Sequence, residues 1–198
     1  MNLIYSAIYK DYDLLKEQPS QKDTDFIMFH DKRVESKTWK IFETKSETGN
    51  MDAKWWKLHP PTGYDMTIWI DGAIEVKPNF IEEIKRQMGD SKYGIQKHPI
   101  RDCVYEEEKA SPDGKYIKER LKHQVYSYME DGLPPHNGLT WNCILVRQGD
   151  TTEFDSMWWN EIEKWSIQDQ LSSPYVQWKL NYPIKILDLK EFVWHHHR

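Results

Sequence analysis

Short apolar runs alternate with polar segments along the sequence. The first run, residues 3–9, is apolar and β-prone and is followed at once by the polar residues 10–13. Further runs of this kind lie at residues 25–29, 38–42, 66–70, 141–146 and 184–187. Apolar runs of this length with polar bounds predict β-strands. Because the runs are nearly continuous in their apolar character, they favour a sheet that is covered on both faces.

Three segments between these runs show helical spacing instead. One begins at the proline of residues 78–80 and stops before Gly89, a second extends over residues 111–131, and a third carries apolar side chains three or four residues apart over residues 154–165. Alternating strands and helices predict an α/β fold with a central mixed, mostly parallel sheet flanked by helices. Since no repeat, low-complexity stretch or Ser/Gly linker divides the chain, we expect one domain over residues 1–198.

Composition narrows the class of protein. Of the 198 residues, 38% are hydrophobic and 14% aromatic, including ten Trp, which is the content of a folded chain. The formal net charge of −5 argues against a nucleic-acid partner, although a local basic groove stays open. No apolar run reaches the ~18–20 residues that span a bilayer. Two cysteines are too few for a disulfide framework, so we expect a cytoplasmic protein.

The sharpest local feature is Asp71, which comes directly after the apolar run 66–70 and is followed by Gly72. In α/β proteins ligands bind at the carboxyl edge of the sheet, where this carboxylate would lie. One interpretation is an oxygen ligand for Mg²⁺ or Mn²⁺ that carries a diphosphate. The other is a turn residue that hydrogen-bonds its own backbone. The same rule predicts that residues 3–9 form a central strand and that residues 10–13 contact a nucleoside.

A second cluster, residues 97–108, combines His98, Arg101 and Glu106 around a proline. The guanidinium suits a phosphate, and the carboxylate suits a sugar hydroxyl. A solvated surface loop has the same composition.

A third group follows the helical segment 154–165. Trp159 falls outside the apolar stripe of that segment, so it is a candidate for lining a cavity. Asp169 and Gln170 lie just beyond it and would either hold a sugar by hydrogen bonds or cap the next helix. The terminal run that includes His195 and His197 offers imidazole ligands for Mn²⁺, or it is exposed.

The sequence contains no GxGxxG or GxxxxGK phosphate loop, no HExxH and no GxSxG. It does resemble nucleotide-sugar glycosyltransferases of the GT-A fold, and more specifically the glycosyltransferase-like family known as domain of unknown function 616. The segments that carry the resemblance occur in order over nearly the whole chain, at residues 5–13, 55–60, 69–72, 98–107, 158–162 and 168–172.

The resemblance implies a Rossmann-like GT-A domain that binds a nucleotide-sugar donor with Mn²⁺ or Mg²⁺ and transfers the sugar to a hydroxyl acceptor. A glycan is the default acceptor, and a lipid or a modified nucleobase stays open. Asp71 would match the last carboxylate of the Asp-x-Asp metal motif, whose first position is Trp69 here, and Asp169 and Gln170 would match the Asp-Gln segment of retaining enzymes. The implied site comprises Asp169 and Gln170 as catalytic residues; Ala7, Tyr9, Asp13, Lys54, Trp69, Asp71 and Arg101 at the nucleotide and donor; His98, Glu106 and Trp159 at the acceptor or sugar; and Asp71, His195 and His197 at the metal.

Two other functions stay open. Some plant relatives in this family have been described as alkaline ceramidases, which makes a metal-dependent hydrolase of a lipid amide one alternative. Such an enzyme needs about three protein ligands and an open metal position, and the sequence shows no clear set of that kind. The other alternative is a catalytically inactive sugar-binding module, because Trp69 replaces the first acidic residue of the metal motif.

Overall fold

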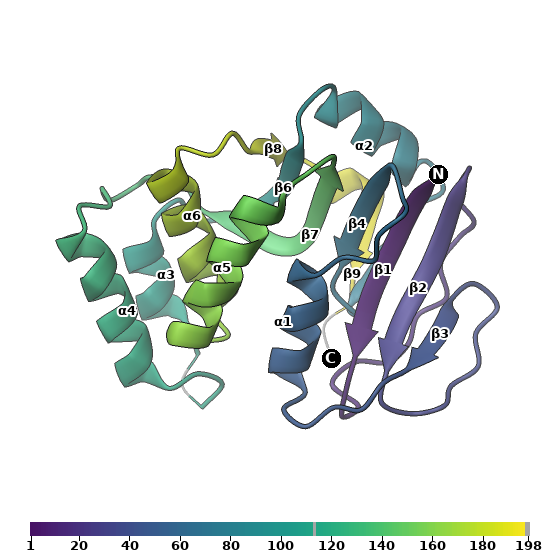
Figure 1. Cartoon of the computed structure of the whole chain (residues 1–198), viewed down its shortest axis with the longest axis horizontal. Helices are drawn as coiled ribbons and strands as arrows, with labels where there is room; N and C mark the ends of the chain where they lie inside the picture. Colours follow the sequence, from purple (N-terminus) through teal and green to yellow (C-terminus); the bar gives the residue numbers. More distant parts are fainter. Residues whose placement is uncertain (113, 197–198) are drawn as a thin grey trace.

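The computed structural model describes residues 1–112 and 114–196, which fold around a mixed sheet (Figure 1). In the described part of the chain this sheet has seven strands in the order β3-β2-β1-β4-β7-β6-β8. Strand β7 is antiparallel to both neighbours, and the other pairs are parallel. The strands are β1 (Asn2–Ile8), β2 (Thr24–His30), β3 (Lys40–Glu43), β4 (Met66–Ile70), β6 (Tyr93–Lys97), β7 (Thr140–Gln148) and β8 (Lys185–Leu187). A smaller sheet pairs β5 (Ile74–Val76) with β9 (Val193–His195).

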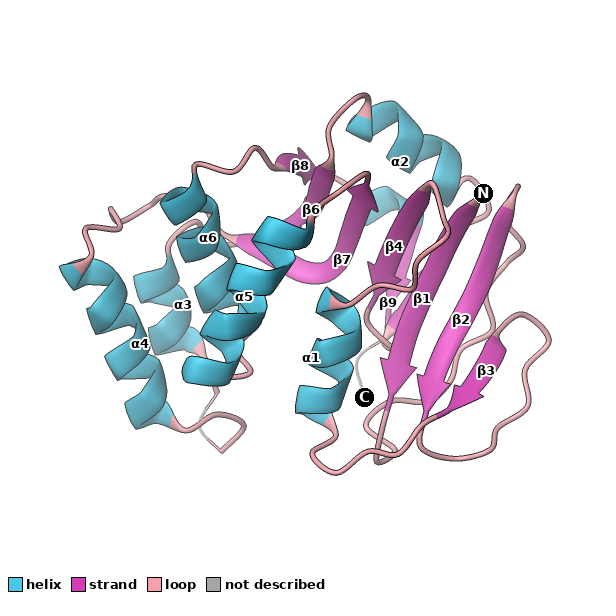
Figure 2. Ribbon diagram, in the orientation of Figure 1, coloured by secondary structure: helices cyan, strands magenta, loops and turns pink. Residues whose placement is uncertain are grey.

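Some helices pack against the sheet, and others form a group to one side of it (Figure 2). Helix α1 lies beside β1, and α3, α4, α5 and α6 gather beyond β7 on the left of the view. The helices are α1 (Asn50–Leu58), α2 (Phe80–Met88), α3 (Val104–Ala110), α4 (Lys118–Glu130), α5 (Thr152–Lys164) and α6 (Asp169–Leu180), with a short 3₁₀ turn η1 (Lys190–Phe192).

Successive side chains of β1 point to opposite faces of the sheet, and each face carries a hydrophobic core. Leu3 and Tyr5 point into a cluster with residues of α1, α4, α5 and α6, whereas Ile4 and Ile8 point into a second cluster with residues of α2, β5 and β7. Every residue of β1 is buried. The mixed, mostly parallel sheet with helices on both faces is therefore confirmed, and so is the central position of the first strand.

Several expected elements need correction. The helix expected over residues 111–131 begins only at Lys118, and the described residues before it, 111–112 and 114–117, are not helical. Residues 97–108 are not a surface loop: helix α3 occupies their second half, and Glu107 and Glu108 are buried. Helices α1 and α6 and strands β5, β6 and β9 were not expected. Within the described residues, none of the helices has the length and apolar character needed to cross a membrane.

Candidate active site

A cavity of about 590 Å³ opens at the carboxyl ends of β1 and β4. These two strands are neighbours in the sheet. After β1 the chain forms β2 and β3 on one side of it, whereas β4 and the later strands of this sheet lie on the opposite side of β1. Ligands of open α/β sheets bind at such a switch point. Ala7 lies near the end of β1 and Asp71 directly after β4, and both line the cavity.

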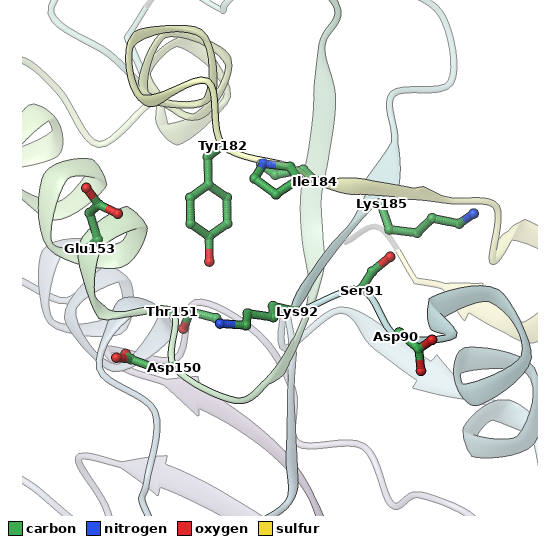
Figure 3. Close-up of a pocket in the computed structure, with 10 residues that line it drawn as sticks. Asp90, Ser91, Lys92, Asp150, Thr151, Glu153, Tyr182, Ile184 and Lys185 are labelled. Carbon is green, nitrogen blue, oxygen red and sulfur yellow. The ribbon is translucent and has the colours of Figure 1, made fainter.

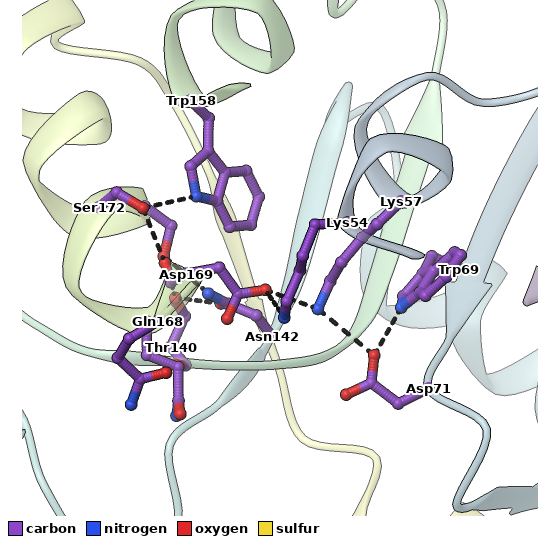
Figure 4. A network of polar contacts seen from close by, with 12 residues as sticks. Lys54, Lys57, Trp69, Asp71, Thr140, Asn142, Trp158, Gln168, Asp169 and Ser172 are labelled. Atoms are coloured by element: carbon purple, nitrogen blue, oxygen red, sulfur yellow. Dashed lines mark hydrogen bonds and ion pairs between the residues drawn. The ribbon is translucent and has the colours of Figure 1, made fainter. Parts of the chain in front are cut away.

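Helix α1 supplies two lysines to this cavity, Lys54 and Lys57, which are three residues apart and so share one face of the helix. The Lys54 Nζ lies 2.5 Å from Asp169 Oδ2, and the Lys57 Nζ lies 2.8 Å from the same oxygen. The Lys57 Nζ also lies 3.3 Å from Asp71 Oδ1. Figure 4 shows the Lys57 ammonium between the two carboxylates, which come from segments almost a hundred residues apart.

Burial makes this network strongly coupled. Burial raises the pKa of Asp169, but the ammonium groups of Lys54 and Lys57 lower it more, so the pKa is about 2. Burial lowers the pKa of Lys57, and the carboxylates of Asp169 and Asp71 outweigh this effect and raise it above its ordinary value. For Lys54 burial prevails, and its pKa is lowered. Asp169 is therefore a carboxylate at neutral pH, held in the protein interior by two cations.

Asp71 is oriented by its own strand. The Trp69 Nε1 donates a hydrogen bond of 2.7 Å to Asp71 Oδ1, which orients the carboxylate. The Asp71 side chain is 40% exposed, on the cavity side of the network. Gly72 allows a close approach here, because a Cβ at this position would lie 2.9 Å from Ile8 Cγ1 and 3.1 Å from Asp13 Oδ2.

A second buried network holds the carboxyl end of α1. The Lys57 carbonyl accepts hydrogen bonds from Arg147 Nη2 at 2.9 Å and from the Tyr5 hydroxyl at 3.1 Å. Arg147 in turn pairs with Asp155 at 2.7 Å, with side chains only 2% and 7% exposed. A guanidinium at the end of a helix also complements the helix dipole. The Lys57 backbone is thus tied to the sheet, which limits where its ammonium can go.

The cavity brings together most of the residues that the sequence singled out. Those that line it are Ala7, Asp13, Lys54, Trp69, Asp71, Asp169, Gln170 and His195. His197 lies outside the described residues. Lys57, which the sequence reasoning missed, lines the cavity as well. Its signal was the spacing of three residues from Lys54, but a lysine in a polar helix is ordinarily expected in solvent.

The remaining candidates do not line this cavity: Tyr9, His98, Arg101, Glu106 and Trp159. The buried Tyr9 hydroxyl shares a hydrogen bond of 2.7 Å with the Thr44 hydroxyl. The partly buried Trp159 packs edge-on against the ring of His59, with the ring centroids 5.5 Å apart.

Arg101 and His98 instead belong to a polar cluster around Glu107. The Arg101 Nε lies 2.6 Å from Glu107 Oε2, and the Arg101 backbone N–H donates to His98 Nδ1 at 2.8 Å. Burial lowers the pKa of His98, although Glu107 opposes this effect. The Gln168 Nε2 donates to Glu107 Oε1 at 3.2 Å, and Gln168 lines the cavity. The cluster therefore supports the residue that precedes Asp169.

Asp13 and His196 also line the cavity, and Asp71 and His195 are the two lining residues that the sequence singled out as metal ligands. They offer a carboxylate and an imidazole, a donor set that fits Mn²⁺ better than Mg²⁺. His195 lies on β9, beside β5, and its ring packs on Trp141 with centroids 5.1 Å apart. Two protein ligands leave the other coordination positions to ligand oxygens and water. Among residues 1–112 and 114–196, three metal-ligating side chains cluster only at the exposed Asp102, Glu106 and His136, away from the cavity lining.

A second cavity, of about 760 Å³, lies at the opposite edge of the sheet (Figure 3). It is lined by residues just before β6 and β8 and just after β7, including Lys92, Asp150 and Tyr182. This is the edge at which the parallel strands begin, and α/β sheets bind ligands at the other edge. None of the candidate residues of the sequence lies there.

Comparison with known proteins identifies relatives of this chain by sequence. The family model described as TOD1/MUCI70, glycosyltransferase-like domain, matches residues 42–195. A curated relative, the probable hexosyltransferase MUCI70 of Arabidopsis thaliana, is 28% identical over 137 residues, which are 63% of this chain and 23% of that protein. The chain thus spans less than a quarter of the length of this relative.

Solved structures show the same fold. Mouse xyloside xylosyltransferase 1 superposes with a TM-score of 0.51 at 9% identity, over 96% of this chain and 86% of that one. The galactosyltransferase LgtC, solved with donor and acceptor sugar analogues, gives a TM-score of 0.50 at 9% identity, over 96% and 74%. Both are GT-A glycosyltransferases, so the fold of this chain is GT-A.

Proposed function

We propose that this chain, which belongs to the TOD1/MUCI70 glycosyltransferase-like family, transfers a sugar from a nucleotide-sugar donor to a hydroxyl acceptor. The observation that carries the proposal is the Lys54–Asp169–Lys57–Asp71 network, which lies in the cavity at the switch point of a GT-A sheet. The sequence segment that supplies Asp169 and Gln170 also matches the Asp-Gln segment of retaining enzymes, so we propose a retaining reaction.

The charges of the cavity favour a donor that arrives with a cation. The described lining contains three aspartates, Asp13, Asp71 and Asp169, and three lysines, Lys54, Lys57 and Lys115, so its formal charges cancel. A diphosphate alone would bring net negative charge into a neutral site. A divalent cation neutralises that charge, and we propose Mn²⁺ or Mg²⁺ held by Asp71 and His195. When bound, the cation would stabilise the leaving diphosphate.

The residues of the chain have distinct roles in the proposed reaction. The Asp169 carboxylate, with its pKa of about 2, is a poor base and a permanent negative charge, which suits the stabilisation of a cationic sugar carbon. Gln170 lines the same cavity and offers an amide for sugar hydroxyls. Lys54, whose side chain is 21% exposed, is proposed to contact a donor phosphate. Residues 10–13 follow β1 at the cavity and are proposed to contact the nucleoside.

The acceptor is proposed to be a glycan. The inactive sugar-binding module remains the second candidate, since Trp69 stands at the first position of the metal motif. It differs from the enzyme in one observable respect, which is that it would bind a donor without cleaving it.

A two-stage assay tests the proposal. A thermal-shift screen of nucleotide sugars, each with and without Mn²⁺, finds the donor, because a specific ligand raises the apparent stability by mass action. Release of the nucleotide from that donor, slow without an acceptor and faster with one, then shows transfer. Stabilisation without release by any donor would favour the binding module. No stabilisation by any nucleotide sugar would refute the proposal.

A further inference from the structure

Lys57 occupies an unusual place for a charged side chain. Its side chain is 1% exposed, and its ammonium contacts Asp71, the proposed metal ligand, as well as Asp169. A buried cation next to a metal carboxylate competes with the metal for the same negative charge. We infer that Lys57 is the resident counter-ion of Asp71 and keeps the affinity of the empty site for a divalent cation low. The inference rests on the proposed function only for the location of the metal site.

The ammonium cannot easily move aside when a cation arrives. The Lys57 carbonyl is fixed by Arg147 and Tyr5 at the end of α1, and Asp169 Oδ2 holds the Nζ at 2.8 Å. The contact to Asp71 is longer, at 3.3 Å. A cation on Asp71 would therefore lie a few ångströms from a positive charge that stays in place. Their repulsion lowers the affinity for the cation, and the loss is greatest when no phosphate is present.

A diphosphate removes this obstacle, because its negative charges offset both the cation and Lys57. The site would then take up the cation together with the diphosphate rather than before it. Lys54 provides the internal comparison. It lies on the same helix face and carries the same charge, but its contact is with Asp169 and its side chain is 21% exposed. Removing its charge should therefore affect a cation on Asp71 much less.

The test is the binding of Mn²⁺ alone, followed by the loss of the free-ion electron paramagnetic resonance signal. We expect Lys57→Met to bind Mn²⁺ on the order of tenfold more tightly than the wild type, since a unit charge a few ångströms away from a divalent ion is removed. The matched control Lys54→Met should change the affinity for Mn²⁺ by less than about threefold, because the Lys54 ammonium is farther from Asp71 and better screened by solvent. Adding Asp71→Asn to Lys57→Met should abolish the gain.

Lys57→Met leaves Asp169 with one cation and is at risk of unfolding. The milder variant Lys57→Gln removes the same charge but keeps an amide that can donate to Asp169, and it too should bind Mn²⁺ more tightly than the wild type. Unchanged or weaker binding in the folded variants overturns the inference, and so does a gain that survives Asp71→Asn. Because the measurement uses no donor, a failure to turn over any nucleotide sugar would refute the proposed function and leave this result standing.

Discussion

Asp169→Asn is the substitution that tests the ion network most directly. It preserves the shape of the side chain and one carbonyl oxygen but removes the charge that pairs with Lys54 and Lys57. Asp169 begins α6, and the residue at the N-cap position is Gln168, so the substitution does not remove a capping side chain. Any loss of stability should therefore come from the ion pairs.

The pKa of Asp169 gives the magnitude. It falls from 3.8 to about 2 on folding. At ~1.4 kcal/mol for each tenfold change, the ionised carboxylate contributes about 2 kcal/mol to the free energy of unfolding. Because the folded-state pKa is the lower one, this contribution is fully present above pH 4 and is lost as the pH falls toward 2. At neutral pH we expect Asp169→Asn to lower the melting temperature by roughly 4–8 °C in a chain of this length.

Urea unfolding of the wild type and Asp169→Asn at pH 7 and at pH 2.5 measures the difference, which should shrink at the lower pH. Asp131→Asn is a matched control: Asp131 also pairs with a lysine, Lys179, but both side chains are more than 40% exposed, and the Asn carbonyl can still accept from the Tyr175 hydroxyl. Surface pairs of that kind contribute ~0–1 kcal/mol. Equal stability of Asp169→Asn and wild type at pH 7 would refute the buried network. With a donor identified, nucleotide release should fall by ~10²–10³ in this variant, as it does when a preorganised charge is removed.

Three further substitutions address the rest of the site. Asp71→Asn should remove most Mn²⁺-dependent nucleotide binding in calorimetry with little change in urea unfolding, because the side chain is 40% exposed; unchanged binding would reduce Asp71 to a turn residue. Arg147→Met leaves the Asp155 carboxylate buried and unpaired, so it should lower the free energy of unfolding by ~3–5 kcal/mol, and a loss below about 1 kcal/mol would contradict the pairing. Gly72→Ala places a Cβ 2.9 Å from Ile8 Cγ1, and we expect a loss of ~1–3 kcal/mol in urea unfolding together with weaker Mn²⁺-dependent nucleotide binding. Full stability of Gly72→Ala would show that the turn has room to relax.

The sequence predicted those site residues whose position follows from the neighbouring strand or helix in the chain. Asp71 follows a strand directly, so its place at the edge of the sheet follows from the strand itself. Lys57 and Arg147 could not be placed in this way. Both types of residue are expected in solvent. They are buried only because their partners come from segments 112 and 90 residues away, as in the contacts of the Lys57 Nζ with Asp169 and of Arg147 with the Lys57 carbonyl.

The same limit explains the segment 97–108. Three consecutive glutamates resemble a solvated face, yet Glu107 is buried and Arg101, 2.6 Å away, is its cation. Within the segment, the Nε of the guanidinium that the composition offered to a phosphate is paired with Glu107. A charged side chain in such a cluster can bind a ligand or pair with another side chain of the protein. Which of the two it does depends on distances in the tertiary structure, which the composition of the segment does not give.

Trp69 stands at the position where the metal motif implied by the resemblance has its first acidic residue, so this position carries no negative charge here. A second carboxylate here would add negative charge beside Asp71, whereas Trp69 donates a hydrogen bond of 2.7 Å and adds none. With Lys57 also at Asp71 Oδ1, this oxygen already has two donors. A cation on Asp71 then depends on the remaining electron pairs of the carboxylate and on ligands from outside α1 and β4. Under the proposed function, the charge of the donor would therefore have to supply more of the metal binding than it would beside two aspartates.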